Sequence, residues 1–151
     1  MTTISEEALE LEVRVAASPS TVFTFLKDAD GMAQWFGSSV EMDAKPGGVL
    51  RVDINGRDIA KGEIVEIVPP ERIVFTFGWE GDGNPVPPGS SRVEITLAAD
   101  GEGTIVKLRH SGLTAEQAAS HKEGWDHYLP RLLQLAEGGD PGKDPWAEGD
   151  M

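Results

Sequence analysis

Residues 114–136, TAEQAASHKEGWDHYLPRLLQLA, decide the fold of this chain. Thr114 and Gln117 have the spacing of a capping box, which places the start of a helix at this point. A stripe at helical spacing follows, made of Ala118, His121, Trp125, Leu129, Leu132 and Ala136. The segment therefore predicts a C-terminal helix of about two dozen residues with one apolar face, ended by Gly138-Gly139.

Upstream of this helix the apolar residues recur at every second position, the period of half-buried strands. The segments with this pattern are Leu9–Val15, Leu50–Ile54, Ile59–Val68, Arg72–Trp79, Arg92–Ala99 and Val106–His110. Asn55-Gly56 and Asp100-Gly101 are tight-turn dipeptides, so they predict hairpins and an antiparallel sheet. Ser18-Pro19 and Asp30 predict the starts of two short helices after the first strand. The second is expected to end near Trp35-Phe36, where Gly37 offers a left-handed stop.

One face of this sheet is rich in large apolar side chains, among them Phe75, Phe77 and Trp79. Only the final helix is long enough to cover such a face, so the sheet must curl around it. We therefore predict an α+β fold in which a curved antiparallel sheet of about six to seven strands wraps around the C-terminal helix. Residues 1–137 form one domain on this view, and residues 138–151 form an acidic tail rich in Pro and Gly.

The composition excludes several classes of partner. The 151 residues include 13 Lys and Arg against 26 Asp and Glu, a net charge of −13, which repels nucleic acids and anionic membranes. With no cysteine the chain has neither disulfides nor thiol ligands, which fits the cytoplasm. The N-terminus lacks a signal sequence and no apolar run has the length of a membrane span, so we expect no membrane insertion.

The histidines are the main candidates for chemistry. His121 and His127 are six residues apart and fall on different helix faces, so no metal site is expected, nor any other cofactor. His110 sits at a strand end on the inward face, where it could meet His121 or Trp125. It is either a hydrogen-bonded histidine at the rim of a cavity or a proton-transfer group. The residues after Trp79, Gly81–Gly89, could act as a mobile lid.

Four segments also resemble a known family. They are residues 62–77 (GEIVEIVPPERIVFTF), 108–113 (LRHSGL), 124–129 (GWDHYL) and 138–146 (GGDPGKDPW). In this order they are similar to the SRPBCC (START-like, helix-grip) superfamily, in its branch of ninety-kilodalton heat-shock protein ATPase activator homologues. The resemblance implies a hydrophobic cavity between the sheet and the helix. The superfamily includes lipid and sterol carriers, polyketide cyclases and resistance proteins, so it implies no single function.

We interpret the chain as a non-catalytic binder or carrier of a small hydrophobic or aromatic molecule, and we assign no catalytic residue. The expected pocket residues are Trp35, Phe75, Phe77, Trp79, Ile95, Val106, Leu108, His110, His121, Trp125 and Leu129. One alternative is a polyketide cyclase or dehydratase with His110 as its acid or base. Another is an interaction module acting on a chaperone, and whether the chain forms a homodimer stays open.

Overall fold

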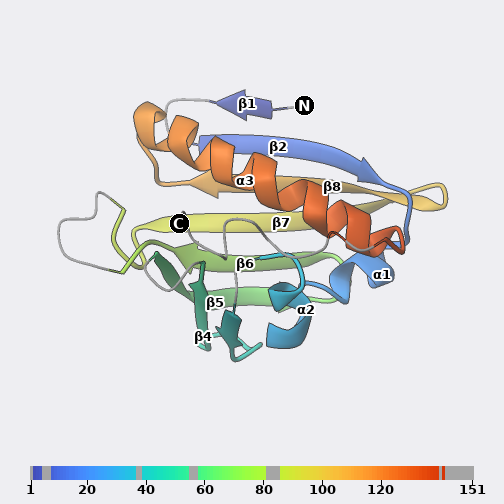
Figure 1. The fold of residues 1–151 in the computed structure, drawn as a ribbon, viewed down its shortest axis with the longest axis horizontal. Coiled ribbons are helices and arrows are strands. Elements are labelled where there is room, and N and C mark those ends of the chain that lie inside the picture. Colours follow the sequence, from blue (N-terminus) through green and yellow to red (C-terminus); the bar gives the residue numbers. More distant parts are fainter. Residues whose placement is uncertain are drawn as a thin grey trace.

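The architecture is a single antiparallel sheet with one long helix against it, as Figure 1 shows for this computed structural model. The structure describes residues 2–4, 8–36, 39–54, 58–80, 86–139 and 141. The strands are β1 (Thr2–Ile4), β2 (Ala8–Val15), β3 (Ser39–Met42), β4 (Val49–Asp53), β5 (Ile59–Val68), β6 (Arg72–Phe77), β7 (Ser91–Asp100) and β8 (Gly103–Ser111). The helices are α1 (Pro19–Phe23), α2 (Ala29–Ala33) and α3 (Ala115–Ala136).

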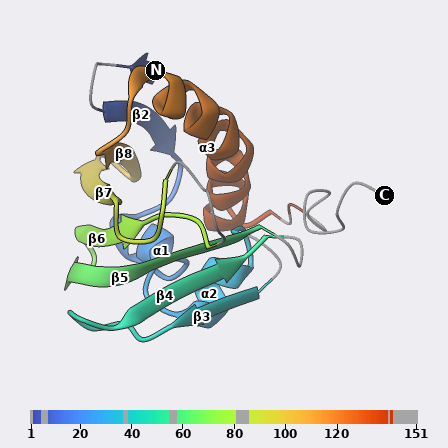
Figure 2. The same ribbon diagram turned by 90° about the vertical axis from the view of Figure 1, so that its left-hand side faces the viewer.

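The sheet has eight strands in the order β1-β2-β8-β7-β6-β5-β4-β3. Figure 2 shows it curving from β2 round to β3, with α3 on its concave side. α1 packs against α3, β7 and β8, and α2 packs against β3. The predicted α+β helix-grip architecture is therefore confirmed. No described helix is long and apolar enough to cross a membrane.

The sheet contains two strands that the sequence did not predict. β1 and β3 are the two edge strands, each pairing on one side only, and they span three and four residues. In β3 the burial simply alternates between exposed and half-buried positions, with Val40 and Met42 as the inward pair. Such a short alternation is too weak to stand out in a sequence, so the expected number of six to seven strands was too low.

The two short helices follow β2 as predicted, with different ends. Ser18 caps α1 by accepting a hydrogen bond from the amide of Thr21, and Pro19 opens the helix. α1 ends at Phe23. The cap of α2 is Asp28 rather than the predicted Asp30, because the Asp28 carboxylate accepts from the amide of Gly31 at 2.7 Å. The predicted stop at Gly37 lies outside the described residues.

The start of α3 is the predicted capping box. The Thr114 hydroxyl accepts from the amide of Gln117 at 3.2 Å, and the Gln117 side chain accepts from the amide of Thr114 at 2.9 Å. The helix continues through Pro130, whose missing N–H falls on an exposed position. Figure 2 shows that the helix is curved, which suits the curved sheet.

Strand register places apolar side chains on the inner face and charged side chains on the outer face. Leu11, Leu108 and Ile95 lie side by side across β2, β8 and β7, and all three are buried. On the outer face the neighbouring row pairs Glu10 and Glu94 with Arg109. The two-residue period of a strand thus produces one dry face and one ionic face from the same segments.

The predicted hairpins are present as strand pairs. β4 pairs antiparallel with β5, and β7 pairs with β8 through Gly101, whose φ of +63° requires the left-handed region. The Asn55-Gly56 turn lies outside the described residues, as does most of the expected 138–151 tail. The division into residues 1–137 and a tail remains an expectation.

Candidate functional site

The site is organised around His110, which β8 places in the interior. Its neighbours across the sheet are Leu9 on β2 and Val93 on β7, so its side chain lies on the apolar inner face beneath α3. None of its surface is exposed to solvent. Among the described residues the only other buried polar side chains are those of Ser91 and Thr104.

Both ring nitrogens of His110 are hydrogen-bonded. The indole Nε1–H of Trp125 donates to Nδ1 at 3.1 Å, which fixes Nδ1 as an acceptor. Nε2 lies 2.8 Å from Ser91 Oγ, and the Ser91 hydroxyl donates to the carbonyl oxygen of Phe77 at 2.7 Å. Because that hydroxyl proton is already used, Nε2–H must donate to Ser91, and His110 is the neutral Nε2–H tautomer.

His121 on α3 is fixed in the opposite tautomer. Its Nδ1 lies 2.8 Å from the carbonyl oxygen of Gln117, one helical turn earlier, and can only donate to it. Its Nε2 is then an acceptor, and it receives the indole Nε1–H of Trp79 at 3.0 Å. Both His121 and Trp79 are half-buried, so this second pair forms the outer edge of the site.

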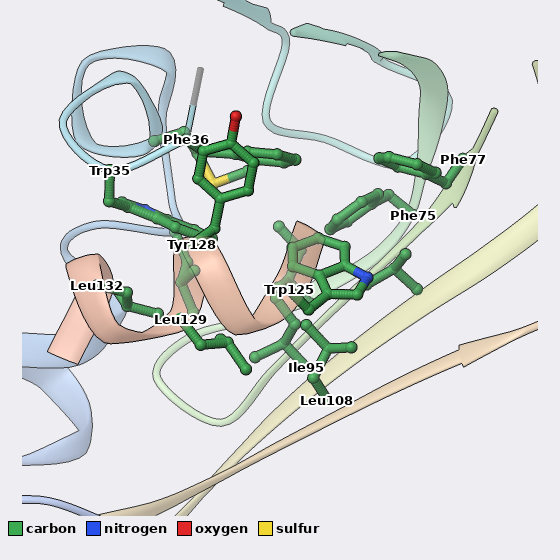
Figure 3. Close-up of a cluster of buried hydrophobic side chains, with 14 of the residues drawn as sticks. Trp35, Phe36, Phe75, Phe77, Ile95, Leu108, Trp125, Tyr128, Leu129 and Leu132 are labelled. Atoms are coloured by element: carbon green, nitrogen blue, oxygen red, sulfur yellow. The ribbon is translucent and has the colours of Figure 1, made fainter. Parts of the chain in front are cut away.

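We call Phe77, Trp79, His110, His121 and Trp125 the ring cluster. Phe77 is at its centre, with ring centroids 5.0 Å from His110, 5.5 Å from Trp79 and 6.0 Å from Trp125. The two imidazoles meet edge to face at 5.0 Å. Figure 3 shows Phe75 and Phe77 on the strand and Trp125 on the helix pointing toward one another. Since these rings are in contact, a ligand that enters must part some of them.

A second aromatic group continues from the ring cluster toward α2. Phe36 lies 5.4 Å from Trp125, 5.2 Å from Trp35 and 4.9 Å from Tyr128. The Trp35 indole donates to the carbonyl oxygen of Phe25 at 2.8 Å. Phe36 therefore links Trp35 to the ring cluster, although it was not among the expected pocket residues.

The remaining predicted pocket residues line the same interior. They are Phe75, Ile95, Val106, Leu108 and Leu129, and all are buried. Two polar residues of the site were missed: Ser91 and Gln117. Ser91 follows a Pro/Gly-rich segment and reads as a turn serine, whereas Gln117 acts through its backbone carbonyl, which no side-chain pattern reports.

Trp79 lies just beyond the end of β6 rather than within the strand. The predicted strand Arg72–Trp79 ends at Phe77, and Trp79 forms an isolated bridge to Ala60. Its backbone N–H donates to the carbonyl of Val86 at 2.7 Å, so the end of the expected lid segment packs beside it. Most of that lid, residues 81–85, lies outside the described residues.

The interior holds both histidines uncharged. Burial, and secondarily the neighbouring His121, lowers the pKa of His110 to about 3. Burial also lowers the pKa of His121, although the bond to the Gln117 carbonyl opposes it. A neutral His110 with both nitrogens engaged has no lone pair to offer a substrate, which argues against it as a general base. No group of three or more potential metal ligands converges within the described part of the chain.

The outer face of the sheet offers a different surface. A shallow depression there is lined largely by charged side chains of β2, β7 and β8, such as Glu12 and Lys107. An apolar molecule would have to desolvate these charges, so the inner face is the better candidate for one.

Comparison with protein families identifies the chain. The family described as "Activator of Hsp90 ATPase homolog 1-like protein" matches residues 16–137. A search of curated proteins gave no significant match.

Solved structures with the same fold support this match. An AHSA1-like protein of Rhizobium etli is 41% identical, with 100% of this chain and 96% of that chain covered and a TM-score of 0.69. DynU16, described as a protein in the dynemicin biosynthetic locus, is 27% identical with a TM-score of 0.78. Coverage is 91% of this chain and 49% of DynU16, so the chain spans about half of that protein's length.

A third solved structure has the same fold. The Aha1 dimer of Colwellia psychrerythraea is 19% identical, with a TM-score of 0.73 over 87% of this chain and 97% of that one. At this identity the likeness concerns the fold alone. That relative is a dimer.

Proposed function

We propose that this chain, which belongs to the activator of Hsp90 ATPase homologue 1-like family, binds a small apolar or aromatic molecule between the sheet and α3 without converting it. The carrying observation is the ring cluster itself. Its deep members, Phe77, His110 and Trp125, are buried, while Trp79 and His121 are half-buried and joined by one side-chain hydrogen bond. A molecule that parts the outer pair would therefore meet a surface of aromatic faces and edges.

The electrostatics of the interior favour a neutral ligand. Apart from His110 no acidic or basic side chain is buried among the described residues, and His110 is uncharged. A carboxylate or ammonium group in the cluster would lose its hydration without gaining a counter-charge. Flat aromatic molecules would instead gain stacked and edge-to-face contacts with Phe77, Trp79 and Trp125.

Binding fits the geometry better than turnover. A cyclase-like reaction needs a group that gives or takes a proton at the substrate, and His110 was the sequence-based candidate. Its nitrogens are held by Trp125 and Ser91, and its low pKa keeps it neutral. The description of DynU16 as a protein of a biosynthetic locus supports a natural product as ligand, and binding accounts for such a role as well as catalysis does.

The test is ligand detection in the full chain. Native mass spectrometry after mild purification should show a retained small molecule, and neutral aromatic compounds should raise the melting temperature. A ligand at one hundred times its dissociation constant adds about 2.7 kcal/mol to the free energy of unfolding. Phe77→Leu, at the centre of the cluster, should weaken binding.

Phe25→Leu is the matched control, because Phe25 is partly buried against the core but lies outside the ring cluster. It should lower stability while leaving the affinity unchanged. A broad neutral panel without any shift, together with no retained mass, would overturn the proposal. Capture of a heat-shock ATPase by a chain that binds no panel compound would instead favour the chaperone module.

A further inference from the structure

The hydrogen bond between Trp79 and His121 presents a donor and an acceptor side by side at the edge of the ring cluster. Trp79 Nε1 is a donor only, and it lies 3.0 Å from His121 Nε2. His121 Nε2 is an acceptor because Nδ1–H is committed to the carbonyl oxygen of Gln117. A molecule that separates the two rings leaves one N–H and one lone pair facing the space between them.

We propose that this pair is a recognition site for a hydroxyl group on the bound molecule. The ligand oxygen would accept the indole N–H of Trp79, and the ligand O–H would donate to Nε2 of His121. One hydroxyl then replaces the lost hydrogen bond with two. The inference rests on the proposed function, since it names the chemical group by which a neutral aromatic or apolar ligand is held.

Other neutral and charged groups fit this pair less well. An ether or ketone oxygen can accept from Trp79 but has no proton for His121. An ammonium group can donate to His121 but cannot accept. A carboxylate accepts only, and its charge would have no buried cation beside it among the described residues. A hydroxyl is the simplest group that is donor and acceptor at a single atom.

The acceptor is preset by the helix rather than chosen by the ligand. Gln117 is held at the third position of α3 by the capping box with Thr114, and its carbonyl fixes the His121 ring. Burial lowers the pKa of His121, which keeps the Nε2 lone pair free of a proton at neutral pH. The acceptor therefore exists before a ligand arrives, and no tautomer change is needed to use it.

The deeper pair is not an equivalent site. Trp125 and His110 are also joined by an indole-to-imidazole bond, but both are almost fully buried and His110 also donates to Ser91. Parting them would break the first of three linked hydrogen bonds, which run from Trp125 through His110 and Ser91 to the Phe77 carbonyl, and would leave Nδ1 of His110 without its donor in the fully buried interior. The outer pair also loses one hydrogen bond when it parts, but Trp79 and His121 are only half-buried, so a ligand can reach them from solvent.

Three probes of nearly equal shape test the proposal: naphthalene, 2-methoxynaphthalene and 2-naphthol. Binding to the full chain is measured by calorimetry, with the tryptophan indole N–H cross-peaks followed by NMR. 2-Naphthol should bind at least about tenfold tighter than naphthalene, because naphthalene leaves the parted donor and acceptor unpaired. 2-Methoxynaphthalene should fall between them, and 2-naphthol should shift the Trp79 indole peak.

Variants separate the two halves of the site. Trp79→Phe should abolish the advantage of 2-methoxynaphthalene over naphthalene, whereas His121→Phe should leave it in place. Each single variant should reduce the advantage of 2-naphthol over naphthalene. The double variant should remove it, because neither hydrogen-bond partner of the hydroxyl remains and 2-naphthol is the less apolar of the two molecules. His127→Phe is the matched control on the same helix, because His127 contacts Tyr128 and lies outside the ring cluster.

The binding results test the hydroxyl site separately from the proposed ligand-binding function. Equal binding of all three probes to the wild-type chain would overturn the hydroxyl site and leave ligand binding intact. A 2-naphthol preference that survives in the double variant would also overturn it. If none of the probes binds, the hydroxyl site is overturned, and the proposed function is then decided separately by the broad panel and the retained mass.

Discussion

The indole N–H of Trp125 on α3 donates to Nδ1 of His110 on β8 over 3.1 Å, joining helix and sheet by a side-chain bond in the interior. Trp125 is 3% exposed and His110 is fully buried, so water cannot replace either partner if the bond is lost. The bond also sets the His110 tautomer and, through it, the contact with Ser91. It therefore fixes the position of α3 along the sheet.

This bond can be measured by a double-mutant cycle. Trp125→Phe keeps an aromatic ring but leaves Nδ1 of His110 unpaired, and should cost about 2 kcal/mol of unfolding free energy. His110→Phe leaves the Trp125 N–H unpaired. In the double variant neither polar atom remains, so its cost should be about 1 kcal/mol less than the sum, measured by urea unfolding.

The control cycle uses Trp35→Phe with His110→Phe. The Trp35 indole donates to the Phe25 carbonyl, so its loss should add to that of His110 without coupling. Simple additivity in the Trp125 cycle as well would contradict a direct bond.

The capping box of α3 gives a second prediction. Thr114→Ala removes the hydroxyl that accepts from the Gln117 amide and should cost about 1 kcal/mol. Thr114→Ser keeps the hydroxyl and should cost less. If Gln117 also positions His121, the alanine variant should weaken 2-naphthol more than naphthalene, which calorimetry with both probes would detect.

Much of the fold could be read from the sequence because its elements alternate strictly. The central strands and α3 show periods of two and of 3.6 residues, and their ends carry turn or capping residues. The edge strands β1 and β3 could not be predicted, since each covers only three or four residues. The cap of α2 was misplaced because Asp28 and Asp30 are both suitable residues, and the choice depends on the path of the chain after α1.

The site was only partly visible in the sequence. Inward-facing His110 was expected to meet His121 or Trp125, and the structure brings it to both. The tautomers could not be predicted, since they depend on Ser91 across the sheet and on a backbone carbonyl of Gln117. The expected pocket residues lie together in the interior between the sheet and α3, and their role in binding a ligand is a proposal.

Substitution by alanine should have opposite effects on stability at two glycines. A Cβ at Gly62 on β5 would collide with the carbonyl oxygen of Thr76 on β6, whereas a Cβ at Gly124 on α3 would project into open space. Gly62→Ala should push the paired strands apart and cost about 3 kcal/mol. Gly124→Ala should stabilise the chain by about 1 kcal/mol, because alanine is the better helix former. Thermal unfolding of both variants checks this, and equal effects would show that the close approach at Gly62 is wrong.

The low pKa of His110 makes stability depend on pH in a defined window. In the folded chain the pKa of His110 is about 3, against an ordinary value of 6.5. At a pH between these two values His110 is protonated in the unfolded chain and neutral in the folded chain. Stability from this residue is complete above pH 6.5 and is lost as the pH falls below it. Between pH 8 and pH 5 the loss should be about 2 kcal/mol. His121 should add to it in the same direction, because burial lowers its pKa as well.

The measurement compares urea unfolding of the wild-type chain and of His110→Phe at pH 8 and at pH 5. Most carboxylates titrate below pH 5, so they contribute little to the difference. The variant should be less stable at pH 8, because the Trp125 N–H and Ser91 lose their partner. It should lose about 2 kcal/mol less than the wild type on acidification, so the two curves converge toward low pH. In the folded wild type the imidazole resonances of His110 should not shift above pH 5. Titration of those resonances near pH 6.5, or equal losses in both proteins, would show that His110 is reached by solvent and that the closed ring cluster opens at neutral pH.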